Sequence, residues 1–246
     1  MAQQPTRTAI VTGAGKRVGR AIAEGLLADG WAVVAHVHHA DDAVPVGAVA
    51  VAADLADEGA STTIFAAADA LPPVRLLVNN AARFAEDRLE TIEAAGFDSH
   101  MAVNVRAPAL LTQLFARRIG DSGGALVVNL LDAKLSALNP DYLSYTLSKI
   151  ALAGLTELTA RALAGQGIRV NGIAPALMLQ SDGQDESNFE AMHRFNPLGR
   201  GVEPEDVVAA LRYLIGATAM TGEILTLDGG QRFWALTRDV QYLEKK

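Results

Sequence analysis

Tyr145 and Lys149 are the pair whose residue types and spacing best suit proton chemistry. They stand four residues apart in the segment YTLSK, so on a helix they share one face, one turn apart. A free tyrosine phenol has a pKa of about 10, which is too high for ready proton exchange at neutral pH. A nearby ammonium group stabilises the phenolate and lowers that pKa, so the pair is a candidate for general acid–base catalysis. Because the same spacing is common on solvated helices, this interpretation needs support from other segments.

A glycine-rich turn, VTGAGKRVGR, occupies residues 11–20. Its glycines allow backbone N–H groups to approach a pyrophosphate, and a helix that follows adds the positive end of its dipole. The spacing departs from G-x-G-x-x-G because a lysine and an arginine stand inside the turn. The alternative is a tight strand-to-helix turn with solvated basic side chains. The residues predicted to bind the cofactor here are Gly13, Lys16, Arg17, Val18 and Gly19.

Basic side chains also gather in the segment AHVHHADD. A cofactor with a free ribose 2′-OH is usually met at such a strand end by an acidic residue, but the corresponding position is the apolar Val37. With Lys16 and Arg17 nearby, His38 and His39 form a donor-rich pocket that suits a 2′-phosphate, which favours NADP(H) over NAD(H). Two adjacent histidines also suggest a metal pair, but no third ligand is evident, so we predict no metal site.

The elements that must position these groups alternate along the chain. The predicted strands are residues 8–11, 31–37, 47–55, 74–82, 123–132, 168–175 and 222–230, and the predicted helices are 20–28, 58–71, 97–119, 140–165 and 204–216. The segments 177–200 and 232–246 are expected to be irregular, forming a substrate loop and a C-terminal tail. The strands are continuous apolar runs, which indicates a parallel sheet covered by helices on both faces.

Ligands bind outside the carboxyl ends of the strands in such a doubly wound sheet, so residues at strand ends are candidates for the cofactor site. Those predicted to bind the cofactor are Asp54, Leu55, Asn80, Ala81 and Pro175. No shift in composition marks an internal boundary, and we expect a single α/β domain over residues 1–246.

Composition excludes several classes of protein. The 246 residues carry a net charge of −7, which argues against a nucleic-acid or anionic-membrane surface, and half of them are hydrophobic, which argues against disorder. The absence of cysteine excludes disulfides and thiolate metal sites. The start MAQQPTRTAI lacks a signal-peptide pattern and no run of about 18 apolar residues occurs, so we expect a cytoplasmic protein.

The segments TGAGKRVG, NNAA, MAVNVRAP, YTLSK and NGIAP occur in this order, and MTGEILTLDGG extends the pattern to nearly the whole chain. Together they resemble the short-chain dehydrogenase/reductase family. The resemblance implies a Rossmann-type, doubly wound, mainly parallel seven-stranded sheet, a nicotinamide cofactor and hydride transfer. It assigns proton donation to Tyr145, contact with the cofactor ribose and control of the tyrosine pKa to Lys149, and support of a proton-relay water to Asn104.

Two positions depart from the family's usual pattern. Arg17 stands where a small glycine is usual, and Asp132 stands thirteen residues before Tyr145, where a serine is usual. Loss of the serine hydroxyl weakens polarisation of a ketone, whereas an aspartate suits a substrate with ring nitrogens and N–H groups. Arg17 and Asp132 together resemble the pteridine reductase branch, which includes dihydromonapterin and dihydrofolate reductases. That resemblance implies a pterin stacked on Phe84; the predicted substrate residues are Arg17, Phe84, Asp132, Tyr145, Leu177 and Met178.

The predicted function is NADPH-dependent reduction of a dihydropterin, dihydromonapterin or dihydrofolate to the tetrahydro form. Family resemblance also implies a homotetramer built on the helices near 97–119 and 142–166. One alternative is a keto-reductase for 3-oxoacyl or small carbonyl substrates, which would tolerate Arg17→Gly. Another is a non-catalytic NADP(H)-binding sensor, although a sensor has no need of Asn104, Tyr145 and Lys149 together.

Overall fold

Seven short apolar segments form one parallel sheet. In the computed structural model, which describes residues 4–178, 185–234 and 236–243, they are β1 (Thr8–Val11), β2 (Ala32–Val37), β3 (Val49–Ala52), β4 (Val74–Asn79), β5 (Ala125–Leu130), β6 (Ile168–Pro175) and β7 (Ile224–Leu227). Their order is β3-β2-β1-β4-β5-β6-β7, and every pairing is parallel. Strands β1, β2 and β5 are buried along their whole length, which explains their unbroken apolar sequence. The predicted Rossmann-type sheet is confirmed.

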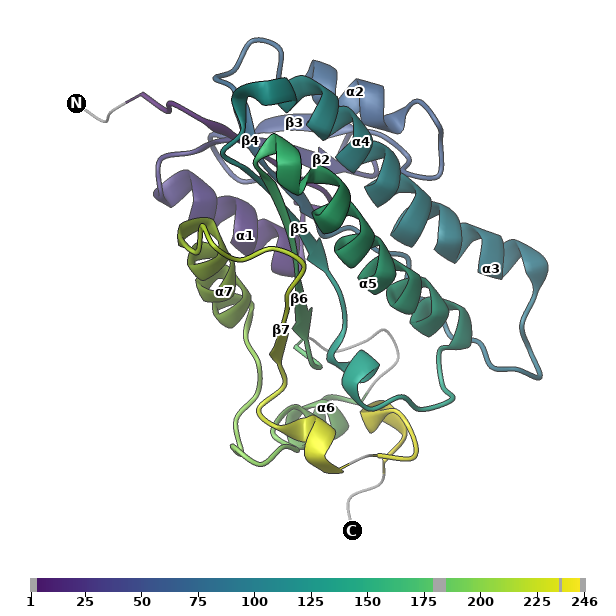
Figure 1. Ribbon diagram of the computed structural model, residues 1–246. Coiled ribbons are helices and arrows are strands. Elements are labelled where there is room, and N and C mark those ends of the chain that lie inside the picture. Colours follow the sequence, from purple (N-terminus) through teal and green to yellow (C-terminus); the bar gives the residue numbers. More distant parts are fainter. Residues whose placement is uncertain (1–3, 179–184, 235, 244–246) are drawn as a thin grey trace.

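Helices cover both faces of this sheet. They are α1 (Arg17–Ala28), α2 (Ala60–Ala66), α3 (Ala94–Met101), α4 (Ala107–Ile119), α5 (Leu143–Leu163), α6 (Glu186–His193) and α7 (Pro204–Gly216). Helices α1 and α7 pack together on one face, while α2, α4 and α5 lie on the other (Figure 1). Two large apolar cores result, one on each side, and Leu76 and the adjacent Leu77 of β4 enter opposite ones because successive strand side chains alternate.

The strand order reverses between β1 and β4, which are neighbours in the sheet although two strands separate them in the chain. In doubly wound sheets, such a reversal opens a crevice outside the carboxyl ends of the strands. Helix α6 and the described part of the C-terminal tail contact each other beyond the ends of β6 and β7 (Figure 1). The fold therefore gathers the candidate site residues at one edge of the sheet.

The structure corrects the bounds of two predicted helices and adds a helix that was not predicted. The segment predicted as one helix over 97–119 begins at Ala94 and is interrupted by a π-helical turn, η1 (Ala102–Arg106). Helix α1 begins at Arg17, three residues earlier than predicted. The irregular structure expected over 177–200 is wrong for α6, which forms because the Asp185 side chain caps it by accepting the Asn188 N–H at 3.1 Å. Residues 179–184, 235 and 244–246 of the predicted loop and tail lie outside the described residues.

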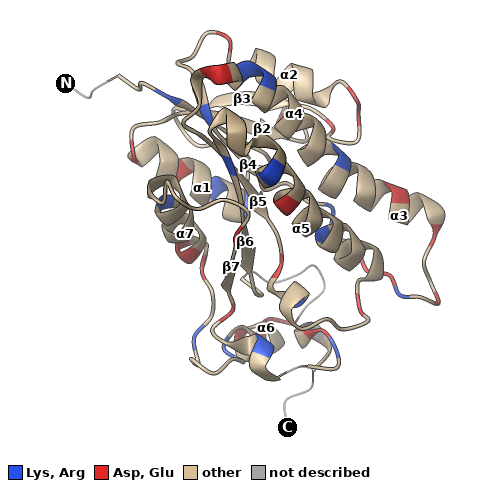
Figure 2. Ribbon diagram, viewed as in Figure 1, with Lys and Arg blue, Asp and Glu red and all other residues tan. Residues whose placement is uncertain are grey.

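Basic and acidic residues are interspersed along the helices and loops (Figure 2). This distribution agrees with the modest negative net charge of the chain. Over the described ranges, we find no helix that combines the length and apolarity needed to cross a membrane.

Candidate active site

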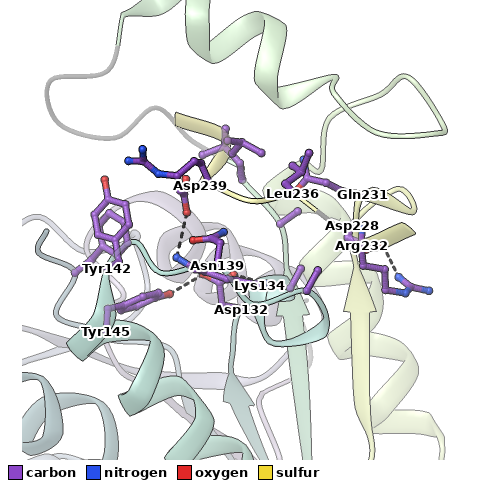
Figure 3. A pocket seen from close by; sticks show the side chains of 17 residues that line it. Asp132, Lys134, Asn139, Tyr142, Tyr145, Asp228, Gln231, Arg232, Leu236 and Asp239 are labelled. Carbon is purple, nitrogen blue, oxygen red and sulfur yellow. Dashed lines mark hydrogen bonds and ion pairs between the residues drawn. The ribbon is translucent and has the colours of Figure 1, made fainter. Parts of the chain in front are cut away.

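Asp132 and Tyr145, predicted to handle protons, are in direct contact. Asp132 follows the end of β5 and Tyr145 lies in the first turn of α5. The Tyr145 hydroxyl donates a hydrogen bond to Asp132 Oδ2 at 2.9 Å, and the backbone N–H of Lys134 donates to Asp132 Oδ1 at 2.8 Å (Figure 3). Because the second bond holds the carboxylate from the opposite side, Asp132 presents a fixed oxygen to the phenol.

Burial controls the protonation of this pair. It raises the pKa of Asp132, an effect opposed by the Lys134 backbone N–H, the Tyr145 hydroxyl and the Lys149 ammonium. Burial and the neighbouring Asp132 together raise the pKa of Tyr145 well above its ordinary value. Tyr145 therefore retains its proton at neutral pH and shares it with the aspartate. The expectation that Lys149 lowers the pKa of Tyr145 is wrong in this structure, since desolvation and the acidic neighbour dominate.

Lys149 is buried behind the pair. Its Nζ donates to the backbone oxygen of Leu130 at 2.6 Å and lies 5.5 Å from the centroid of the Tyr145 ring. Burial lowers the pKa of Lys149 to about 8, although the charge of Asp132 acts in the opposite direction. The Lys149 ammonium group is thus held at the end of β5, and its pKa is close to neutral pH.

Asn104 lies inside the π-helical turn, a feature that often occurs at functional sites. Its Oδ1 accepts the Arg83 N–H at 2.7 Å, and its Nδ2 donates to the Arg83 backbone oxygen and to Ser148 Oγ, each at 2.9 Å. The side chain therefore ties the loop after β4 to α5. This contact positions both Phe84 and the helix that carries Tyr145, while the predicted support of a relay water stays a prediction.

The glycine-rich turn leaves no room for larger side chains at Gly19. A Cβ built there would lie 2.0 Å from the Gly13 backbone oxygen and 2.5 Å from Asn80 Nδ2. The Asn80 amide donates to the backbone oxygens of Thr12 at 2.8 Å and Gly13 at 3.2 Å, and the Ala81 N–H donates to Thr12 Oγ1 at 3.0 Å. The loop after β4 thus fixes the turn after β1.

The start of α1 fits the phosphate groups of a dinucleotide. Its N-cap residue, Lys16, makes no side-chain capping hydrogen bond, so no capping side chain competes for the N–H groups of the first turn. Lys16 and Arg17 are both exposed at this positive end of the helix dipole. Arg17 has a φ of 54°, in the left-handed region that glycine favours, at a position where the family usually has glycine.

A buried histidine that sequence reasoning missed supports the same turn. The Gly13 N–H donates to His36 Nδ1 at 3.2 Å, and His36 Nε2 lies 2.9 Å from the Ala53 backbone oxygen. Burial lowers the pKa of His36, so the neutral ring accepts at Nδ1 and donates from Nε2. The signal was a histidine inside the otherwise apolar strand AVVAHV.

The other predicted cofactor residues lie in α1 and near strand ends, in different environments. His38 and His39 are exposed, with ring centroids 4.1 Å apart, and His38 Nε2 lies 3.7 Å from Asp54 Oδ2. Val18 and Leu55 are buried in the two apolar cores, and Pro175 is the last residue of β6. The exposed histidines are therefore available at the edge where a 2′-phosphate is predicted.

A cavity of about 120 Å³ lies beside the Tyr145–Asp132 pair. Phe84 lines it, half-exposed, with its ring stacked on Tyr142 at 4.4 Å between centroids and meeting Tyr145 edge-on at 4.8 Å. Leu177 also lines the cavity, whereas Met178 packs against the core between the sheet, α1 and α7. Arg17 is not among the described residues that line it, so the predicted contact between Arg17 and a pterin stays a prediction.

The C-terminal tail also reaches this cavity, which sequence reasoning did not foresee. Leu236, Arg238, Asp239 and Val240 line it, and Lys134 Nζ lies 3.5 Å from Asp239 Oδ2 (Figure 3). Among the residues that the structure describes, no group of three or more histidine and acidic side chains is arranged to hold a metal ion.

Comparisons with known proteins agree with this architecture. The family model described as enoyl-(acyl carrier protein) reductase matches residues 13–232. Pteridine reductase 1 of Leishmania tarentolae is 33% identical, with 97% of this chain and 100% of that protein aligned. Galactitol 2-dehydrogenase (L-tagatose-forming) of Cereibacter sphaeroides is 34% identical over 92% of this chain and 95% of that protein. The crystal structure of FolM alternative dihydrofolate reductase 1 from Brucella canis, complexed with NADP, has a TM-score of 0.86 at 34% identity, covering 95% of this chain and 96% of that one.

The family match spans most of the chain, and the structural likeness covers 95% of it. The relatives include enzymes named for pterin reduction and for polyol oxidation, all at similar identity. The chain therefore belongs to the short-chain dehydrogenase/reductase family of oxidoreductases and is similar to its pteridine reductase-like branch.

Proposed function

We propose that this protein is an NADPH-dependent reductase of a dihydropterin-type substrate. The observation that carries the proposal is the 2.9 Å hydrogen bond from Tyr145 to Asp132 in a cavity lined by Phe84. A carboxylate at this position suits a substrate that presents N–H groups and basic ring nitrogens. The similarity to pteridine reductase 1 and to a FolM alternative dihydrofolate reductase supports the same substrate class.

The residues at the glycine-rich turn suit the cofactor. Backbone N–H groups at the start of α1, together with Lys16 and Arg17, would hold the pyrophosphate, and His38 and His39 would meet a 2′-phosphate. Lys149 of α5, whose Nζ reaches the Leu130 backbone oxygen at the end of β5, would hold the ribose. When bound, NADPH supplies the hydride that reduces the C=N bond of the substrate.

Tyr145 and Asp132 would then manage the proton. Tyr145 remains a phenol at neutral pH because burial and Asp132 raise its pKa, so it has a proton to give to a substrate nitrogen. Once Tyr145 has given its proton, Asp132, whose pKa is also raised, would take up a proton from water and pass it to the Tyr145 phenolate. Phe84 would stack on the flat ring and orient it, which lowers the entropic cost of reaching the reactive geometry.

A keto-reductase is the second candidate, favoured by the similarity to galactitol 2-dehydrogenase. Asp132 argues against it, because an anionic carboxylate cannot polarise a ketone as a hydroxyl does. A non-catalytic NADP(H) sensor would have no need for the buried contacts among Asp132, Tyr145 and Lys149. The homotetramer predicted through the long helices, now α4 and α5, remains part of the proposal.

The decisive experiment follows NADPH oxidation by absorbance with dihydrobiopterin, dihydromonapterin, dihydrofolate and a panel of ketones. We expect turnover of at least one dihydropterin, and activity on ketones alone would overturn the proposal. Oxidation of NADPH by no substrate on this panel would favour the sensor. Repeating the assay with NADH tests the cofactor, because equal efficiency with both would contradict the role given to Lys16, Arg17, His38 and His39.

A further inference from the structure

We propose that the ion pair between Asp141 and Arg238 clamps residues 236–243 across the substrate cavity and thereby sets the substrate specificity of the enzyme. We call residues 236–243 the strap. The substrates used to test this inference rest on the proposed function, while the clamp itself rests on geometry alone. Asp141 and Arg238 act through the strap, so they are positioning residues.

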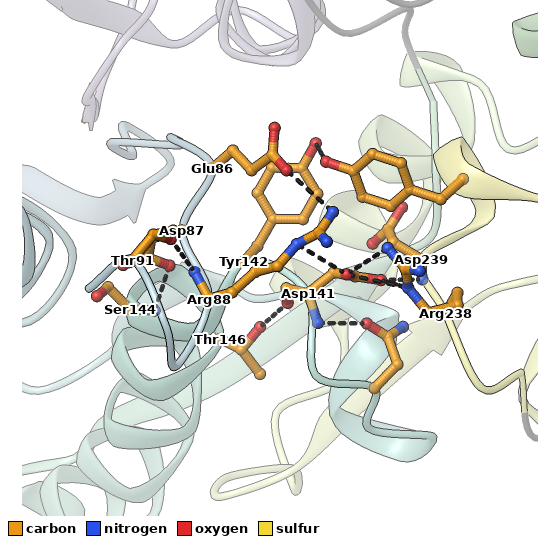
Figure 4. A network of polar contacts seen from close by, with 12 residues as sticks. Glu86, Asp87, Arg88, Thr91, Asp141, Tyr142, Ser144, Thr146, Arg238 and Asp239 are labelled. Atoms are coloured by element: carbon orange, nitrogen blue, oxygen red, sulfur yellow. Dashed lines mark hydrogen bonds and ion pairs between the residues drawn. The ribbon is translucent and has the colours of Figure 1, made fainter.

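The clamp is a two-pronged, charge-assisted contact. Arg238 Nε lies 2.8 Å from Asp141 Oδ2 and 3.1 Å from Oδ1, and Arg238 Nη2 donates to Oδ1 at 2.9 Å (Figure 4). The backbone N–H of Asp239 adds a bond to Asp141 Oδ2 at 2.9 Å. The Asp141 side chain is only 2% exposed and the Arg238 side chain 41%, so the carboxylate is shielded from water while the guanidinium stays partly solvated. Two successive residues of the strap are thus fixed to one buried carboxylate.

Asp141 also connects the strap to the rest of the site. It precedes α5, which carries Tyr145, and its Oδ1 lies 3.6 Å from Arg88 Nε in the loop after β4. Burial acts to raise the pKa of Asp141, but hydrogen bonds from Arg238 and Asp239 outweigh it and lower that pKa. Asp141 is therefore anionic at neutral pH, and the clamp is intact under physiological conditions.

The strap forms one wall of the cavity that contains Tyr145 and Asp132. Leu236, Asp239 and Val240 line it, and Val240 is buried. Lys134 joins the strap to the opposite side, with its Nζ 3.5 Å from Asp239 Oδ2 and 2.5 Å from the Asp141 backbone oxygen (Figure 3). A second fixed point therefore holds the strap close to the reacting groups.

Aromatic rings extend this wall to the residue proposed to stack on the substrate. The ring of Tyr242 in the strap stacks on Tyr142 at 6.1 Å, and the Tyr142 ring stacks on Phe84 at 4.4 Å. The two tyrosine hydroxyls lie 3.4 Å apart. Release of the strap would remove support from Phe84 as well as the wall formed by Leu236 and Asp239.

Two consequences for specificity follow. A compact ring contacts the wall directly, so it loses binding when the strap is released. A substrate with a long anionic substituent has to pass the strap and the carboxylate of Asp239. When the strap is released, its binding therefore weakens less than that of the compact ring, or becomes tighter. Releasing the strap should therefore change the relative KM values of compact and extended substrates more than kcat.

The test compares wild type with Arg238→Gln and Asp141→Asn, using NADPH with dihydrobiopterin and dihydrofolate. We expect KM for dihydrobiopterin to rise roughly tenfold, with kcat changing less and with the KM ratio shifting toward dihydrofolate. Arg238→Lys keeps the positive charge but loses the two-pronged guanidinium contact. Its KM for dihydrobiopterin should therefore lie between those of wild type and Arg238→Gln. Arg212→Gln is the matched control, because Arg212 makes a similar two-pronged pair with Asp29, at 2.7 and 2.9 Å, away from the cavity.

Hydrogen exchange supplies a readout that does not depend on activity. Amides of the strap should exchange faster in Arg238→Gln than in wild type, while amides of α1 should not change. Unchanged strap exchange would overturn the clamp, and faster exchange with an unchanged KM ratio would overturn its role in specificity. If wild type reduces no dihydropterin, the proposed function fails. Hydrogen exchange of the strap then still tests whether the clamp exists, and the KM values of the carbonyl substrates that the enzyme does reduce test whether it sets specificity.

Discussion

The Tyr145 hydroxyl donates its proton to a hydrogen bond of 2.9 Å with Asp132 Oδ2, inside a site where burial raises the pKa of both groups. Two acids so close titrate as a unit, and the proton is shared between them. The pair can therefore give a proton and recover it. A phenolate stabilised by a lysine would have no proton to give.

Removing either member should impair reduction of dihydropterins. We expect Asp132→Asn and Tyr145→Phe each to lower kcat by about 10²–10³, because positioned proton transfer contributes on that scale. The double variant should be little worse than the single ones, since the two residues act as a unit. Steady-state assays check this, and an Asp132→Ser variant with unchanged dihydropterin turnover would refute the role of Asp132.

Thermal unfolding separates this effect from misfolding. The pKa of Asp132 is raised in the fold, so its charged form destabilises the native state at pH values above that pKa. We therefore expect Asp132→Asn to keep or raise the melting temperature while activity falls. A large fall in both would attribute the lost activity to structure.

Activity should decline at alkaline pH because of Lys149. Its pKa is lowered to about 8, so the free enzyme loses this cation as pH rises through about 8, and kcat/KM for NADPH should fall there. In Lys149→Arg, which stays charged, any remaining activity should lack this alkaline limb. Deprotonation of Lys149 should not lower the free energy of unfolding as pH rises above about 8. In the unfolded chain this lysine has a pKa of about 10.4, so it binds more protons there than in the folded protein.

The tight turn at Gly19 should tolerate no side chain. In Gly19→Ala the new Cβ would overlap the Gly13 backbone oxygen at 2.0 Å, which has little freedom to move. We expect loss of NADPH binding in a fluorescence titration, together with a lower melting temperature. Gly59→Ala is the control, because its Cβ meets nothing within 4 Å and its backbone is not left-handed. Normal NADPH affinity in Gly19→Ala would contradict the role of this turn.

The sheet was predictable because its strands are unbroken apolar runs, and burial on both faces leaves little choice but a covered parallel sheet. The candidate pair Tyr145 and Asp132 was predicted because their thirteen-residue spacing can be read directly from the sequence. The pKa of Tyr145 was predicted in the wrong direction, since desolvation depends on the packing of distant segments. Spacing alone cannot show that Lys149 points to a backbone oxygen of β5.

Other features had no local signature. Asp141 and Arg238 are 97 residues apart, and nothing in either segment indicates that the two charges pair. Asn104, inside the π-helical turn, makes a tertiary hydrogen bond with Arg83, which an apolar periodicity does not reveal. Helix α6 is only eight residues long and lies in a polar stretch, so the only sign of it in the sequence was the capping residue Asp185.

Arg17 offers a last test, because its backbone and its side chain have opposing effects. Its φ of 54° costs an ordinary residue roughly 1–2 kcal/mol, so Arg17→Gly should relieve this strain and keep or raise the melting temperature. The guanidinium, however, is proposed to hold both phosphate and pterin, so KM should rise for NADPH and for the dihydropterin. Lys16→Ala, at a position with extended backbone, removes a neighbouring charge without relieving strain and is the matched control. A stable Arg17→Gly variant with unchanged KM values would contradict the dual role of Arg17 and favour the keto-reductase.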